Sequence, residues 1–150
     1  MSSKVDRSKY YRSEYYQVAI LVAMATVAQR MGINKGVAFV MVKSKRDALG
    51  NPRYIVVNEV LVREPVGREV EMVDPGTNYF GAAMGKLAYM LAKGVDSGTK
   101  DQTHKGEMPY RGGLVKEVDD DQIYIGFSGG TENQDVEIAE FGMKMLLSAE

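Results

Sequence analysis

One apolar run in the sequence limits the fold more than any other feature. Residues 36–42 are Gly-Val-Ala-Phe-Val-Met-Val, and no polar side chain interrupts them. The run is too short for a helix and is rich in β-branched residues, so it predicts a strand that is buried on both faces. We therefore expect this strand to lie in the centre of a sheet.

The other elements follow from spacing and from turn residues. Apolar residues at helical spacing predict helices over 13–31 and 78–93 and a last helix beginning at Thr131. Further strands are predicted over 54–61, 114–118 and 123–127, and 62–78 is predicted to be mostly loop. The order α-ββ-α-ββ-α without a βαβ rhythm indicates an α+β fold, a profilin-like antiparallel sheet flanked by helices.

Length and composition narrow the class of protein. The 150 residues fit one domain, 1–150, in which we expect 1–12 to be a flexible N-terminal segment. Lys and Arg number 19 against 20 Asp and Glu, which disfavours nucleic acid and anionic lipid as partners. No apolar stretch approaches the roughly 20 residues of a membrane span, and no secretory signal is visible. The absence of cysteine fits the cytoplasm, so we expect a soluble cytoplasmic protein.

The turn between the last strand and the last helix contains candidate catalytic and ligand-binding residues. Residues 126–130 match the G-x-S-x-G nucleophile elbow, but that mechanism needs a histidine after the serine, and the only histidine, His104, precedes Ser128. A better functional interpretation is that Ser128, Gly129 and Gly130 let the backbone approach a ligand, with free N–H groups at the helix start. The alternative is a tight turn that is already capped by Thr131.

Three further positions are candidates for ligand binding. Lys86 lies in an apolar helical stretch, where it could pair with an anionic ligand, unless it is an ordinary exposed lysine. Gly112 and Gly113 flank the same hairpin as Ser128, or they only form a turn. His104 could be an axial haem ligand or a proton carrier, although a lone histidine in a polar loop over 95–110 is more often solvated.

Two clusters are interpreted as structural. The acidic triplet 119–121 is predicted to be a solvated hairpin turn, because a cation there would lack other oxygen ligands. We predict no metal site. The N-terminal tyrosines could stack on a flat cofactor, but we favour a subunit interface for them. They are Tyr10, Tyr11, Tyr15 and Tyr16.

The C-terminal third carries a recognisable signature. It consists of Pro-Tyr-Arg-Gly-Gly at 109–113, Ile-Tyr-Ile-Gly-Phe-Ser-Gly-Gly-Thr-Glu-Asn-Gln-Asp at 123–135, and Ile-Ala at 138–139. This resembles the GlcG/HbpS-like (DUF336) family. The resemblance implies a profilin-like fold, assembly into dimers or higher oligomers, and a binding module of a kind that includes haem-binding sensors and a corrinoid-associated domain. The family's Lys-Ala-x-Thr-Ala helix motif is Lys-Leu-Ala-Tyr-Met at 86–90 here.

Three hypotheses result from the sequence. The first is an oligomeric module that binds haem or a small organic acid. Its site residues would be Lys86, Gly112, Gly113, Ser128, Gly129 and Gly130, with His104 as a possible haem ligand. The second is an enzyme that moves protons on a carboxylate or ketone through Lys86, His104 or a tyrosine. The third is a purely structural assembly protein.

Overall fold

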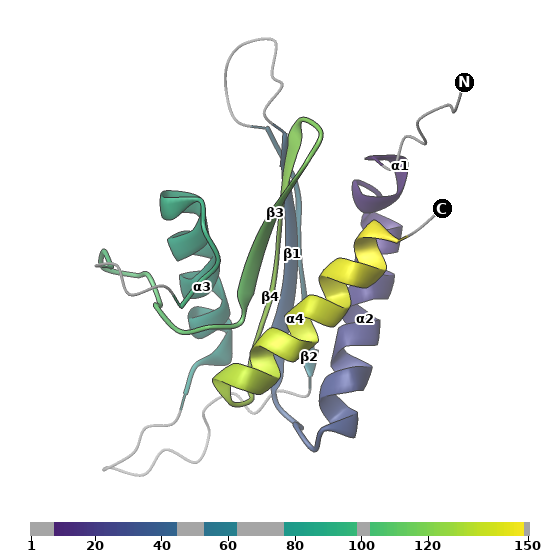
Figure 1. Cartoon of the computed structure of the whole chain (residues 1–150). Helices are drawn as coiled ribbons and strands as arrows, with labels where there is room; N and C mark the ends of the chain where they lie inside the picture. The colour runs from purple at the N-terminus through teal and green to yellow at the C-terminus, as the bar shows by residue number, and fades with distance from the viewer. Residues whose placement is uncertain (1–7, 45–52, 63–76, 99–102, 149–150) are drawn as a thin grey trace.

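The computed structural model describes residues 8–44, 53–62, 77–98 and 103–148 (Figure 1). Its elements in chain order are α1 (Ser8–Tyr11), α2 (Glu14–Arg30), β1 (Gly36–Ser44), β2 (Arg53–Val62), α3 (Tyr79–Lys93), β3 (Gly113–Val118), β4 (Asp121–Ser128) and α4 (Glu132–Leu147). The predicted order of elements is confirmed, with α1 as an addition. Most of the loop predicted over 62–78 lies outside the described residues. Within the described ranges, no helix is both long enough and apolar enough to cross a membrane.

The four strands form one antiparallel sheet in the order β2-β1-β4-β3. β1 pairs along its length with both β2 and β4, so the apolar run is central as predicted. β3 pairs with β4 in a hairpin that turns at Asp119 and Asp120. The expected α+β class, an antiparallel sheet flanked by helices, is confirmed.

Helices cover both faces of the sheet, which explains why β1 has no polar face. α2 and α4 lie together on one face and α3 lies on the other (Figure 1). Alternate β1 side chains pack against the helices on opposite faces of the sheet, because successive side chains of a strand point to opposite faces. Ala38, Val40 and Val42 pack beneath α2 and α4. Val37, Phe39 and Met41 pack against α3.

The helix ends follow the signals in the sequence. The Thr131 hydroxyl accepts a hydrogen bond from the Gln134 backbone N–H, and the Gln134 side chain accepts one from the Thr131 N–H, so the predicted cap at Thr131 is present and is part of a capping box. α3 ends at Gly94, whose φ of 73° is in the left-handed region. These caps satisfy backbone groups that the helix itself leaves unpaired.

The N-terminal residues are anchored at the tip of the β3–β4 hairpin. The Tyr11 hydroxyl donates to Asp121 Oδ2 at 2.6 Å, and Arg12 donates to both oxygens of the same carboxylate at 2.9 and 2.6 Å. The expectation of a flexible segment over 1–12 is therefore wrong for Tyr11 and Arg12. The expectation of a solvated acidic turn is also wrong for Asp121, which is 1% exposed because these two side chains cover it.

The segments around β3 are tied to α3 and to the strand edge. After α3, Ser97 exchanges two hydrogen bonds with Gly113: its backbone N–H donates to the Gly113 carbonyl at 3.1 Å, and its hydroxyl accepts from the Gly113 N–H at 2.8 Å. Further on, the Met108 N–H donates to the Gly85 carbonyl at 3.0 Å, and a Cβ at Gly85 would collide with the Met108 side chain. Ser97 and Met108 are thus the points at which the predicted 95–110 loop is held against the core.

Candidate functional site

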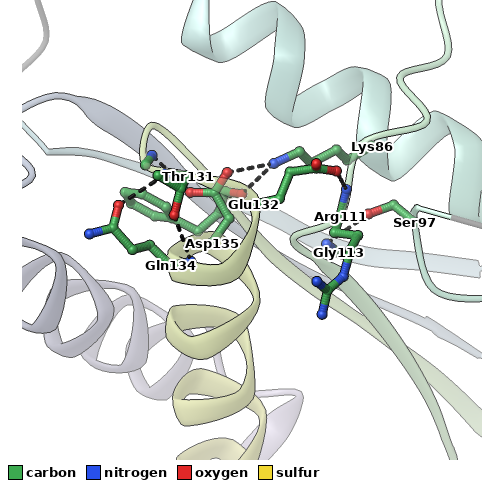
Figure 2. Close-up of polar contacts among 10 residues, drawn as sticks. Lys86, Ser97, Arg111, Gly113, Thr131, Glu132, Gln134 and Asp135 are labelled. Atoms are coloured by element: carbon green, nitrogen blue, oxygen red, sulfur yellow. Dashed lines mark hydrogen bonds and ion pairs between the residues drawn. The ribbon is translucent and has the colours of Figure 1, made fainter.

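A buried ion pair marks the place where α3, α4 and the end of β4 meet. Lys86 Nζ, from α3, donates to Asp135 Oδ2, in the first turn of α4, at 2.9 Å (Figure 2). The same ammonium donates to the Phe127 carbonyl oxygen at 2.8 Å. Since α3 and α4 cover opposite faces of the sheet, the pair joins the two helical layers beyond the end of β4. Lys86 is only 2% exposed and Asp135 4%.

The Asp135 carboxylate uses both of its oxygens. Oδ1 accepts a hydrogen bond from the Gly130 backbone N–H at 2.8 Å, while Oδ2 is bound to Lys86. A negative charge at this position also suits the positive end of the α4 dipole. Asp135 therefore serves as a helix-start acceptor and as the counter-ion of a buried lysine.

Burial shifts the proton affinity of both partners toward their neutral forms. Loss of hydration lowers the pKa of Lys86, and the Asp135 carboxylate opposes that shift. Loss of hydration raises the pKa of Asp135, and the Lys86 ammonium together with backbone N–H groups opposes it. Each charge is stable in the interior because the other is present.

The glycines of the predicted site make room for the protein's own atoms. A Cβ at Gly112, where φ is +123°, would lie 2.7 Å from both Lys86 Nζ and the Asp135 Cβ. A Cβ at Gly113 would lie 2.8 Å from the Met90 Cε, and one at Gly129 would collide with the Lys35 carbonyl. Close packing of the chain against itself, the structural alternative for these glycines, accounts for them without a ligand.

The N–H groups at the start of α4 are also occupied. The Gly130 N–H binds Asp135, the Thr131 N–H binds the Gln134 side chain at 3.0 Å, and the Gln134 N–H binds the Thr131 hydroxyl at 3.2 Å. The expectation of free N–H groups aimed at an anion is therefore wrong for these three. A groove of about 330 Å³ does lie beside this turn, and Lys35, Gly129 and Gly130 are among the residues that line it.

Ser128 differs from its neighbours because its side chain is buried and has no hydrogen-bond partner among the described residues. It is the last residue of β4 and pairs with Val37, so its hydroxyl is on the face covered by α3. The residue is 6% exposed, and its hydroxyl makes no hydrogen bond within the part of the chain that the structure describes. Such groups are uncommon, because burying an unpaired hydroxyl costs free energy.

Lys86 also has more hydrogen-bond donors than acceptors around it among the described residues. An ammonium carries three N–H donors, and two acceptors, Asp135 and the Phe127 carbonyl, are present among the described residues. The Phe127 carbonyl is one residue away from Ser128 along β4, so the spare N–H and the unpaired hydroxyl belong to the same end of the sheet.

His104 lies apart from this cluster. Its side chain is 78% exposed, and Nδ1 is 3.2 Å from Glu107 Oε2. The Glu107 carboxylate also accepts the His104 backbone N–H at 2.7 Å, a bond that lowers the pKa of Glu107. A cofactor site buries most of its ligand's surface. The turn around His104 is exposed, so the haem-ligand role of His104 stays a prediction. The described residues contain no group of three metal-binding side chains.

Asp135 is the residue that the sequence analysis did not single out as part of the site. In the sequence it stands only at the end of the 123–135 signature, whereas in the structure it is the buried partner of Lys86. A usable signal was present: Asp135 lies four residues before Ala139, on the buried face of α4, and a lysine in an apolar helix needs a counter-ion.

Searches of the chain against protein-family models, curated proteins and solved structures find no match. The residues at the end of β4 are therefore the basis for inferring a function.

Proposed function

We propose that this protein is a small-ligand-binding module whose ligand accepts hydrogen bonds from Lys86 and Ser128 at the end of β4. The observation that carries the proposal is the unused hydrogen-bonding capacity of two buried groups, the Ser128 hydroxyl and the third N–H of Lys86. Leaving a polar group buried and unpaired costs about 1–3 kcal/mol. A bound oxygen acceptor removes that cost.

The candidate site combines rigid and polar parts in the way that ligand sites commonly do. Phe39 and Met90 belong to the apolar layer between the sheet and α3, and the polar groups are few and fixed. Lys86 is held by Asp135 and the Phe127 carbonyl, so its remaining N–H has a defined direction. A fixed donor loses little entropy when a ligand binds.

A screen with a matched pair of serine variants tests the proposal. Small carbonyl and carboxylate compounds are added to the wild-type protein, and unfolding is followed by thermal shift. A binder at 100 times its dissociation constant adds about 2.7 kcal/mol of stability. We expect Ser128→Ala to lose this response and Ser97→Ala to keep it, because the Ser97 hydroxyl is already bound to the Gly113 N–H. A response that is equal in both variants contradicts the proposal.

The opposite pKa shifts of Lys86 and Asp135 favour a second candidate, proton transfer on a bound ketone. Perturbed pairs of this kind are common among catalytic acids and bases, and lowering the pKa of a lysine makes its neutral, basic form easier to reach. If the protein has this activity, deuterium from the solvent exchanges into the carbon next to the ketone group. NMR measures that exchange. Lys86→Met abolishes that exchange if this candidate is correct.

We further propose that the module works as a homo-oligomer in the cytoplasm. The outer face of α2 exposes apolar side chains at Tyr15, Val18 and Val22, with Tyr15 87% exposed. Sedimentation velocity tests the assembly: Tyr15→Glu is expected to shift the protein toward the monomer, and a monomeric wild type contradicts it. An assembly that forms without any ligand response favours the purely structural role instead.

A further inference from the structure

Resting on the proposed function, we infer that the site selects a neutral carbonyl ligand, such as an amide or a ketone, over a carboxylate. From the sequence alone, an anionic ligand was one of two interpretations of Lys86, the other being an exposed lysine. In the structure that charge already has a partner, Asp135, at 2.9 Å. Because the Lys86 charge is already balanced by Asp135, a neutral ligand fits the site better than a second anion.

Among the described residues at the site, the buried cation Lys86 already has a counter-ion. Lys86 and Asp135 cancel within the buried pair. Glu132 of α4 also acts on Lys86; it is exposed, and its carboxylate accepts the Arg111 N–H at 2.9 Å. The Arg111 guanidinium is directed to the Asn133 side chain at 2.8 Å. A carboxylate ligand would therefore bring a buried charge without a counter-ion, which is strongly unfavourable.

A neutral carbonyl oxygen avoids this cost. It accepts the spare Lys86 N–H and the Ser128 hydroxyl without adding charge, and Asp135 keeps its bonds to Lys86 and to the Gly130 N–H. A carboxylate can reach the same place only together with a proton, taken up either by the ligand or by Asp135. Binding of the anion is then linked to the uptake of one proton.

Two nearly isosteric probes distinguish these cases with the unmodified protein. Isobutyramide and isobutyrate are titrated into the ¹⁵N-labelled protein, and the amide resonances of 126–130 are followed. We expect isobutyramide to bind with the same affinity from about pH 6 to about pH 8, and isobutyrate to bind more weakly and to lose about tenfold per pH unit. Isobutyrate that binds as tightly as the amide and independently of pH overturns the inference while leaving the proposed function standing. If neither probe perturbs these resonances while other carbonyl compounds stabilise the protein, the inference also fails. If no compound does, the proposed function fails with it.

A single substitution is expected to reverse the preference. Asp135→Asn keeps a side-chain acceptor near Lys86 and Gly130 but removes the negative charge, so the Lys86 ammonium becomes available to an anion. We expect isobutyrate affinity to rise at least about tenfold and its pH dependence to disappear. Glu132→Gln is the matched control, because it removes an exposed carboxylate from the same helical turn and leaves the buried pair intact. If Asp135→Asn does not fold, the pH series on the wild type decides alone.

Discussion

β4 has a buried aspartate near each of its ends, and the two are held differently. Asp121 opens the strand and is bound by Tyr11 and by Arg12, whose side chain is 39% exposed. Asp135 lies beyond the other end and is bound by Lys86, whose side chain is 3% exposed. In the first pair one charge reaches water, and in the second both charges are enclosed. The two ion pairs therefore differ in how far their charges are removed from water.

The difference separates an anchor from a candidate site. At Asp121, the Tyr11 hydroxyl and two Arg12 nitrogens all converge on one carboxylate, and the result is the attachment of the N-terminal segment. At Asp135, the pair is equally well made, but a Lys86 N–H and the Ser128 hydroxyl have no acceptor among the described residues. Unused donors beside an enclosed charge pair favour a ligand, whereas a complete cluster favours structure.

Removing each cation in turn is the strongest test of this comparison. Lys86→Met leaves Asp135 charged and enclosed, so we expect a loss of about 3–5 kcal/mol in the free energy of unfolding. Arg12→Met leaves Asp121 next to water and to the Tyr11 hydroxyl, and we expect about 1–2 kcal/mol. Urea denaturation at neutral pH measures both. Equal losses would show that the two pairs are energetically alike and would remove the distinction.

The backbone beside the enclosed pair supplies a second, smaller effect. Gly112→Ala places a methyl group 2.7 Å from Lys86 Nζ, and the displacement of that nitrogen is expected to cost about 1–3 kcal/mol. Its control is Gly94→Ala, where φ is also positive but no atom lies within 4 Å of the new Cβ. We expect Gly94→Ala to cost less, because only backbone strain is added. Thermal denaturation of both variants measures the difference.

Much of the fold could be predicted because its signals are local. The apolar run at 36–42 required a central strand, and the Thr131–Gln134 capping box fixed the start of α4. The anchoring of Tyr11 at Asp121 could not be predicted in this way, since it joins residues 110 positions apart. The spacing of apolar residues and their helix or strand propensities depend on residues close together in the sequence. They do not predict which distant carboxylate binds a given tyrosine.

The site was predicted only in part for the same reason. Lys86 and Ser128 were recognised as unusual where they stand, the first as a charge in an apolar helix and the second in a glycine turn. The sequence could not show that Lys86 meets Asp135, because the two lie on helices that cover opposite faces of the sheet. Without that contact, the sequence left Lys86 open between an anionic ligand and an exposed position, and it left the glycines open between a ligand and a tight turn.

A pH series sharpens the contrast between the two pairs. Burial lowers the pKa of Lys86, so between that lowered value and the ordinary 10.5 the unfolded chain binds more protons than the folded one. Stability from this group therefore rises with pH across that window, and the gap between the wild type and Lys86→Met should widen as the pH is raised from neutral. The gap to Arg12→Met should stay constant up to about pH 9.5, because arginine stays protonated. A gap to Lys86→Met that narrows contradicts the enclosed-pair interpretation.

The smallest expected effect on stability tests the unpaired hydroxyl itself. Ser128→Ala removes a buried group that has no hydrogen-bond partner among the described residues, so we expect the free energy of unfolding to stay within about 0.5 kcal/mol of wild type or to increase. Ser97→Ala, at an equally buried serine, removes the acceptor of the Gly113 N–H and should cost about 1 kcal/mol. Chemical denaturation without ligand compares the two. If Ser128→Ala costs as much as Ser97→Ala, the Ser128 hydroxyl already has a partner in solution, and the argument that it awaits a ligand is lost. If Ser128→Ala is neutral in stability but loses the ligand response, the hydroxyl acts in binding and not in folding.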